Sequence, residues 1–163
     1  MTKRGERNFA ELYWRHASEA VRLAFLLTGD QHAAEDIAQD AFVRLYGRFQ
    51  ERKSPDAFEA YLRRTIVNLS RDRFRKLRSE RDYVARQAGS PSVQVAIAPQ
   101  IEEREVIREA LQTLPHRQRA ALVLRFYVDL SEQQTADVLQ CSVAAVKSLV
   151  TRATGALRQR NGR

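Results

Sequence analysis

The chain has 163 residues, a length that suits one ordinary domain or two small ones, and 44% of them are hydrophobic, enough for a packed core. Its formal net charge of +8 indicates a polyanionic partner, although a charge surplus that serves solubility would look similar, so the position of the charge matters more than its sum. The single cysteine excludes an internal disulfide and fits a cytoplasmic protein, and there is neither a membrane-spanning apolar run nor a signal peptide. Few glycines and prolines predict a nearly all-α chain.

Two helices are expected near the N-terminus. Apolar residues recur at helical spacing from Asn8 to Leu27, and Thr28-Gly29-Asp30 ends this pattern. A second helix, from His32 to Tyr46, has an apolar face and an outer face that carries Glu35, Asp36, Asp40 and Arg44. Its three carboxylates lack a histidine at matching helical spacing, so a solvated face or a protein contact is preferred to a metal site.

A third helix begins at Ser54-Pro55, after a polar connection, and runs towards Arg78. This helix carries most of the net positive charge. Its segment from residue 63 to 81 has eight basic residues and two acidic ones, Asp72 and Glu80, and so contributes +6 of the net +8. The basic residues are Arg63, Arg64, Arg71, Arg73, Arg75, Lys76, Arg78 and Arg81. Cations interleaved with aromatic rings suit phosphates and unpaired bases. The alternative is a solvated helix end with the rings in the core. We favour nucleic acid for the cations, and the core for Phe58 and Tyr61.

Residues 83–100 contain helix-breaking glycine, serine and proline and are interpreted as a flexible linker. This divides the chain into two small helical domains, residues 1–82 and 101–163. The second domain begins with a helix that ends at Leu114-Pro115. A further helix, from Pro115 to Tyr127, is expected to bury most of its apolar residues, including Phe126 and Tyr127.

The segment from Asp129 to Thr154 has the pattern of a helix-turn-helix. Ser131 can cap its first helix, with Gln134 completing a capping box, and Ser142 can cap the second. In the second helix Val143, Val146 and Val150 should face inward, which leaves Lys147, Ser148, Thr151 and Arg152 outward. Such a helix enters a DNA major groove. The alternative is a surface helical hairpin within a bundle.

The sequence gives little support for a catalytic activity. The sequence has no glycine-rich phosphate loop, and Cys141 lies in an expected turn without a nearby histidine. The three histidines, His16, His32 and His116, fall in different helices. We therefore expect a protein that is not an enzyme and that needs no metal or cofactor.

Four stretches, in this order, resemble the extracytoplasmic-function (ECF) group of RNA polymerase sigma factors in the sigma-70 family. A-E-D-I-A-Q-D-A-F-V-R-L-Y (34–46) and F-E-A-Y-L-R-R-T-I-V-N-L-S-R-D-R-F-R-K (58–76) resemble sigma region 2. L-P-H-R-Q-R-A-A-L-V-L-R (114–125) and the helix-turn-helix resemble sigma region 4. L-L-T-G-D, beginning at Leu26, further resembles a SigE-like subgroup common in actinobacteria.

The resemblance implies a factor that binds core RNA polymerase, directs it to promoters and helps to melt the DNA. Region 2 would dock on the clamp of the largest polymerase subunit through Asp36, Gln39, Asp40, Arg44 and Leu45. Region 4 would meet the flap of the second-largest subunit. An anti-sigma factor is a further expected partner, and the holoenzyme would be associated with the nucleoid.

The resemblance also implies three DNA contacts. The loop at residues 48–55, with Arg52 and Lys53, would capture a flipped base of the minus-ten element. The basic helix would hold the nontemplate strand through Arg63, Arg64, Asn68, Arg71 and Arg75. The outward residues of the helix-turn-helix, Lys147, Ser148, Thr151 and Arg152, would read the minus-thirty-five duplex.

The sequence departs from the family at Gln140, where a turn glycine is usual, and at Leu149 and Thr154, where arginine is frequent. These departures affect which promoter sequence the protein would recognise, and not the resemblance to the family. One alternative is a stand-alone helix-turn-helix regulator, which should bind duplex DNA as the isolated protein. An enzyme or an interaction scaffold is the other, and it predicts a deep pocket with perturbed carboxylates or no binding to nucleic acid.

Overall fold

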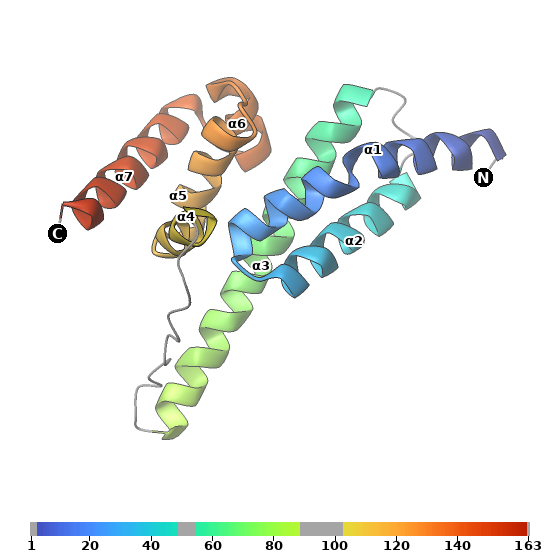
Figure 1. Cartoon of the computed structure of the whole chain (residues 1–163). Helices are drawn as coiled ribbons and strands as arrows, with labels where there is room; N and C mark the ends of the chain where they lie inside the picture. The colour runs from blue at the N-terminus through green and yellow to red at the C-terminus, as the bar shows by residue number, and fades with distance from the viewer. Residues whose placement is uncertain (1–2, 49–54, 89–102, 163) are drawn as a thin grey trace.

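The computed structural model describes residues 3–48, 55–88 and 103–162, and within these ranges the chain forms helices and no strand, so the all-α class is confirmed. An N-terminal unit contains α1 (Lys3–Thr28), α2 (Gln31–Arg48) and α3 (Pro55–Ala88). A C-terminal unit contains α4 (Glu103–Gln112), α5 (His116–Leu122), the π-helical η2 (Val123–Tyr127), α6 (Glu132–Leu139) and α7 (Val143–Asn161). Figure 1 shows the two units side by side, with α3 extending beyond both.

The turn between α1 and α2 is built as the sequence predicts. Gly29 adopts a φ of +70°, a left-handed conformation that glycine reaches without steric cost. Asp30 accepts a hydrogen bond from the Ala33 amide at 3.1 Å and so caps the start of α2. Both helices extend slightly further than the expected ranges.

The core of the N-terminal unit depends on small residues between α1 and α2. Ala24, Ala34 and Ala41 are fully buried, and alanine at such positions lets two helices approach closely. Larger side chains fill the space around them: Leu23, Leu27, Phe42, Leu45, Phe58, Leu62 and Ile66. The expected inner face of α2 and the burial of Phe58 are therefore confirmed, while Tyr61 is half-buried.

Helix α3 is longer than expected. It continues past Arg78 to Ala88, so residues 83–88 of the expected linker are helical. The physical reason is local composition: these residues include no glycine or proline, and Gly89 is the first helix breaker. The rest of the expected linker lies outside the described residues.

The helix from residue 116 widens at its end into η2, where the Val128 amide donates to the Val123 carbonyl at 3.0 Å. This π-type bond adds a residue to the turn and rotates the side chains that follow it. Phe126 and Tyr127 are consequently 67% and 47% exposed, and the prediction that they are buried is wrong.

The helix-turn-helix has the predicted caps. Ser131 and Gln134 form a reciprocal capping box, with bonds of 3.0 and 2.9 Å, and the Ser142 hydroxyl accepts from the Ala145 amide at 3.1 Å. Gln140 occupies the left-handed turn position, with a φ of 54°, where the family usually has glycine. On the inner face of α7 the side chain of Val146 is fully buried, while those of Val143 and Val150 are half-buried.

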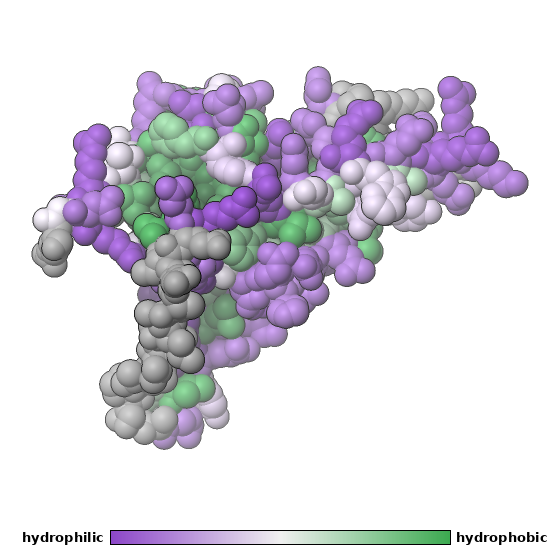
Figure 2. Space-filling model, in the orientation of Figure 1, coloured by the Kyte–Doolittle hydropathy of each residue, from purple (hydrophilic) through white to green (hydrophobic). Residues whose placement is uncertain are grey.

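The two units share one hydrophobic core cluster. It contains Leu27 and Ile66 from the N-terminal unit and Leu114 and Leu124 from the C-terminal unit. Figure 2 shows hydrophilic residues over most of the visible face, with hydrophobic residues gathered over the C-terminal unit. The two units thus pack against each other.

Candidate nucleic-acid interface

The basic face of α3 lies partly beneath the C-terminal unit. Arg63, Arg64, Asn68 and Arg71 are half-buried, whereas Arg75 is exposed. The Arg64 guanidinium donates to the backbone carbonyl of Asp137 in α6 at 2.9 Å. Arg64, Asn68, Arg71 and Arg75 lie at helical spacing on one face of α3. Arg63 points elsewhere and lines a different cavity, with His16 and Glu59.

A groove of about 740 Å³ runs beside this face, between α2, α3 and the helix-turn-helix. Arg44 and Arg48 of α2, Arg64 and Asn68 of α3, and Gln140 of the turn contribute to its walls. Arg48 also donates to the Tyr61 hydroxyl at 3.2 Å. Cations and hydrogen-bonding groups around an open groove suit an extended anionic chain such as a DNA strand. Arg52 and Lys53 lie outside the described residues.

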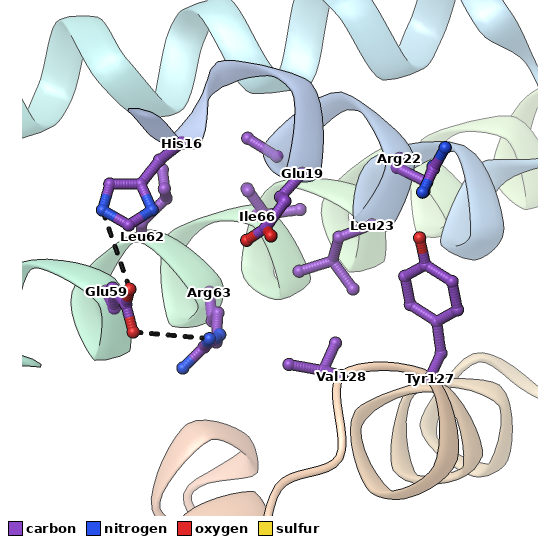
Figure 3. Close-up of a pocket in the computed structure, with 11 residues that line it drawn as sticks. His16, Glu19, Arg22, Leu23, Glu59, Leu62, Arg63, Ile66, Tyr127 and Val128 are labelled. Carbon is purple, nitrogen blue, oxygen red and sulfur yellow. Dashed lines mark ion pairs between the residues drawn. The ribbon is translucent and has the colours of Figure 1, made fainter. Parts of the chain in front are cut away.

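A second cavity, of about 350 Å³, separates α1 and α3 from the C-terminal unit. Figure 3 shows Glu59 between His16 and Arg63, with Tyr127 and Val128 of the C-terminal unit on the opposite side. The Glu59 carboxylate lies 3.5 Å from the Arg63 guanidinium and 3.7 Å from His16 Nε2. Arg63 therefore has an anionic partner on its own helix.

The outer face of α2 is polar and accessible. Asp36, Gln39, Asp40 and Arg44 are exposed, and Arg44 lies 3.4 Å from Asp40 one turn earlier. Leu45 differs from the other predicted docking residues, because it is 4% exposed and packs in the core below this face. Among the described residues no group of three histidine, cysteine or acidic side chains could hold a metal ion.

The outward face of α7 is exposed as expected. Lys147, Ser148, Thr151 and Arg152 are all accessible along one side of the helix. Lys147 lies 3.6 Å from Glu132 of α6, and the Thr151 hydroxyl donates to the Lys147 carbonyl at 2.9 Å. A convex helix with two cations and two hydroxyls can enter a major groove and meet both phosphates and base edges.

Two buried residues of α5 form contacts between the units that the sequence analysis missed. His116 Nε2 lies 2.8 Å from the Ser70 hydroxyl of α3, and Arg119, at 2% exposed, donates to the carbonyls of Leu27 and Leu114. Their sequence signal is a polar pair at i, i+3 on the apolar face of a helix.

Burial shifts the pKa of both side chains. Desolvation, followed by the positive charge of Arg119, lowers the pKa of His116 to about 4. Desolvation lowers the pKa of Arg119 to about 10. At neutral pH His116 is therefore uncharged and Arg119 is still a cation, satisfied by backbone carbonyl groups.

A basic helix and a helix-turn-helix in an all-helical chain are features of DNA-binding proteins. The family model "Sigma-70 region 2" matches residues 12–80, and "Sigma-70, region 4" matches residues 104–157. The N-terminal unit therefore corresponds to region 2 and the C-terminal unit to region 4.

Similar proteins span most of this chain. The RNA polymerase sigma-E factor of Streptomyces coelicolor is 31% identical over 91% of this chain and 84% of its own length. The ECF RNA polymerase sigma factor SigW of Bacillus subtilis is 28% identical over 96% and 91%. The probable RNA polymerase sigma factor RfaY of Xanthomonas campestris is 36% identical over 83% of this chain, which covers 36% of that protein.

A solved structure has the same fold. The sigma factor RpoE of Bartonella quintana, in complex with the anti-sigma factor NepR, has a TM-score of 0.72 and is 22% identical, covering 94% of this chain and 96% of that one. The chain belongs to the sigma-70 family of RNA polymerase sigma factors, in its extracytoplasmic-function group. Sigma factors are transcription initiation factors and not enzymes. No helix within the described ranges has an apolar stretch that could cross a membrane.

Proposed function

We propose that this sigma factor divides promoter recognition among three surfaces: the outer face of α2, the basic face of α3 and the outward face of α7. The main support for this proposal is that the three exposed faces carry different kinds of side chain and belong to different helices. Residues 1–82 form the unit that docks on polymerase and opens the minus-ten element. Residues 101–163 form the unit that reads the minus-thirty-five element.

The outer face of α2 docks on the clamp of the largest polymerase subunit. Asp36, Gln39, Asp40 and Arg44 support this role, because they are exposed polar side chains on one rigid helix. Mixed charges of this kind favour a specific protein contact over a non-specific hydrophobic one. Leu45 supports the face from below. The C-terminal unit meets the flap of the second-largest subunit.

The basic face of α3 holds the nontemplate strand. Arg63, Arg64, Arg71 and Arg75 neutralise phosphates, and Asn68 offers hydrogen bonds at the groove beside α2. Binding the separated strand offsets part of the free energy lost when base pairs open. Arg52 and Lys53, in the preceding loop, are proposed to flank the flipped minus-ten base.

The outward face of α7 reads the minus-thirty-five duplex through Lys147, Ser148, Thr151 and Arg152. An anti-sigma factor is a further proposed partner, supported by the complex in which the Bartonella relative was solved. The protein is proposed to act in the cytoplasm, associated with the nucleoid when it is bound to polymerase.

Abortive initiation with purified core RNA polymerase on a promoter pool tests this assignment. We expect the double variant Arg63→Ala/Arg64→Ala to slow promoter melting by about tenfold or more, because two phosphate contacts are lost. Its affinity for core polymerase should stay within about twofold, since α2 is untouched. The readouts are permanganate footprinting for melting and fluorescence anisotropy for polymerase binding.

The matched control is Arg4→Ala/Arg7→Ala, which removes the same charge from exposed positions of α1. It should melt the promoter as the unmodified protein does. An equal loss of polymerase affinity in the α3 variant would contradict the division of labour. Failure of the unmodified protein to start specific transcripts on any promoter in the pool would contradict the proposed promoter recognition.

A further inference from the structure

The lysine on the outward face of α7 is held by a carboxylate from the other helix of the helix-turn-helix. Lys147 Nζ lies 3.6 Å from a carboxylate oxygen of Glu132, the first residue of α6. Their side chains are 65% and 39% exposed, and an ion pair this exposed contributes little to the stability of a fold. The consequence of the pair therefore lies at the surface that faces DNA.

The backbone positions of both residues are fixed. The reciprocal capping box of Ser131 and Gln134 sets the start of α6, and Glu132 follows the cap directly. Val146 is fully buried next to Lys147 and so fixes the rotation of α7 about its own axis. The remaining freedom lies in the side chains, and lysine has a flexible four-carbon stem. The carboxylate of Glu132 thus restricts where the ammonium group of Lys147 lies.

The carboxylate belongs to the same DNA interface as the ammonium group. In a helix-turn-helix the recognition helix places its N-terminal part against base edges, while the first helix crosses the backbone. Lys147 lies about one turn from Val143, where α7 begins, and Glu132 lies beside it at the start of α6. A group that Lys147 contacts in the major groove therefore also lies close to the carboxylate of Glu132.

A paired ammonium group favours base edges over phosphates. The carboxylate offsets its positive charge, so its attraction to a phosphate is weaker than that of a free lysine. Its hydrogen-bonding capacity is kept, because an ammonium group has three N–H donors and the contact with Glu132 leaves two. Base edges are neutral, and guanine offers two neighbouring acceptors, O6 and N7, in the major groove. Guanine is therefore the base that suits this pair.

The second cation of the same face has a different environment. Arg152 is exposed, and within the described part of the chain it has no ion-pair partner. Its guanidinium group is free to meet a phosphate, a contact that positions a protein on DNA without reading the sequence. The outward face of α7 thus carries one cation suited to phosphate and one suited to a base.

We propose that Glu132 is a specificity-determining residue, whose carboxylate positions the Lys147 ammonium group so that it reads a guanine of the minus-thirty-five element instead of binding a phosphate. This inference rests on the role proposed for the outward face of α7. The ion pair lowers affinity for duplexes that lack the guanine and thereby raises discrimination among promoters. Glu132 acts through Lys147, so its effect on discrimination requires the lysine.

Filter binding with holoenzyme tests the inference on two duplexes. One is a promoter selected from a pool by the unmodified holoenzyme, and the other is the same promoter with its minus-thirty-five bases scrambled. Glu132→Gln should bind the scrambled copy about fivefold more tightly than the unmodified protein does, because the released lysine gains a phosphate contact. Its affinity for the selected promoter should rise by less than about twofold. An equal gain on both duplexes would overturn the inference.

A salt series on the scrambled copy supplies an independent readout. The slope of log affinity against log salt should be steeper by about 1 in Glu132→Gln, as expected for one added phosphate contact. An unchanged slope would overturn the proposed release of the lysine to phosphate.

Two further variants distinguish the ion pair from the negative charge alone. Glu132→Asp keeps the charge on a shorter side chain that falls short of the ammonium group, and it should lose most of the discrimination that Glu132→Gln loses. In a Lys147→Ala background, Glu132→Gln should change discrimination by less than about twofold. Full discrimination in Glu132→Asp, or an undiminished effect without the lysine, would assign the effect to general repulsion and overturn the positioning role.

The base is tested with 7-deazaguanine, which lacks the N7 acceptor. A promoter copy with this analogue at every minus-thirty-five guanine should bind the unmodified holoenzyme about fivefold more weakly than the selected promoter does. The loss should be smaller in Lys147→Ala, which has no ammonium group to donate. An element without guanine, or an equal loss in both proteins, would overturn the contact with guanine.

The matched control is Glu109→Gln. Glu109 of α4 lies 3.9 Å from Arg160 near the other end of α7, so this variant removes the same charge and releases a cation of the same helix. It should leave discrimination unchanged. Lys147→Ala by itself separates the inference from the proposed function. If that variant binds both duplexes as the unmodified protein does, the role of Lys147 in α7 fails; if it loses promoter affinity while Glu132→Gln keeps full discrimination, only the role of Glu132 fails.

Discussion

Arg119 combines a cationic side chain with almost complete burial. Its guanidinium is 2% exposed and donates to the carbonyls of Leu27, Leu111, Gln112 and Leu114. The fixed fork of arginine suits several carbonyl groups at once, and the shorter, single-headed ammonium of lysine does not. One side chain thus satisfies backbone groups of α1, of the end of α4 and of the turn between α4 and α5.

Replacing Arg119 with leucine should lower the free energy of unfolding by about 3 kcal/mol or more, because several buried carbonyls lose their donor. Arg119→Lys should recover only part of this loss. Urea denaturation followed by circular dichroism measures both variants. Arg117→Leu is the control, since Arg117 is exposed on the same helix. A loss below about 1 kcal/mol in Arg119→Leu would show that water replaces the guanidinium.

His116 predicts a pH dependence of stability. Burial is the largest cause of its low pKa, which is about 4 against an ordinary 6.5. Nearby positive side chains lower the pKa further: Arg119 and Arg117 of α5, and Arg71 and Arg75 of α3. Below pH 6.5 the unfolded chain takes up a proton that the folded chain refuses. The free energy of unfolding therefore falls as the pH drops, by about 2 kcal/mol between pH 7 and pH 5.

Urea titrations at pH 7, 6 and 5 measure this effect. His116→Gln removes the titrating group and should flatten the dependence over this window. His32→Gln, at an exposed position of α2, should leave it intact. The same fall in stability in His116→Gln as in the unmodified protein would assign the effect to other groups.

At the scale of single elements, the helix-turn-helix shows how local signals place a functional helix. The serine caps fix the starts of α6 and α7, and Gln140 takes the left-handed turn conformation despite its Cβ atom. Such a conformation costs a non-glycine residue roughly 1–2 kcal/mol, which the rest of the motif offsets. The result is that Val146 faces the core and Lys147 faces outward.

Removing the two cations of this helix, with Lys147→Ala/Arg152→Ala, should weaken duplex binding by holoenzyme about tenfold or more. The slope of log affinity against log salt should decrease by about 2 if both meet phosphates. Filter binding over a salt series measures this change. Arg158→Ala/Arg160→Ala, near the end of the same helix, is the charge-matched comparison. An unchanged slope with lost discrimination among promoters would indicate contacts to bases instead of phosphates.

At the scale of the whole molecule, the two units behave as neighbours in one structure. Their hydrophobic residues form one cluster, and Ser70, His116 and Arg119 join them through buried polar contacts. Burial shared between units couples their unfolding, because opening one exposes apolar surface of the other.

We therefore expect α3 and α5 to lose hydrogen-exchange protection in a single urea transition. The variant His116→Arg places a further cation among Arg71, Arg75 and Arg119 and should separate this transition into two. Hydrogen–deuterium exchange with mass spectrometry follows each helix. Gln118→Arg, which adds the same charge at the neighbouring half-buried position, should keep one transition. Two transitions in the unmodified protein would contradict the coupling.

The sequence by itself determined the helices and their faces. Helical periodicity, the Gly29 turn and the serine caps depend on residues within one or two turns, and the structure has them as predicted. The outward placement of Asp36, Asp40, Lys147 and Arg152 follows from the same local pattern. Local interactions suffice for such features because each helix buries its apolar stripe wherever its partner lies.

Only the tertiary structure decided which faces meet. Periodicity predicts that a face is buried, but Ser70 and His116 are 46 positions apart, and no local pattern pairs them. The π-turn that exposes Phe126 and Tyr127, and the burial of Arg119, likewise depend on packing around α5. The bond from Arg64 to the Asp137 carbonyl belongs to the same class, because it joins residues that are 73 positions apart in the sequence.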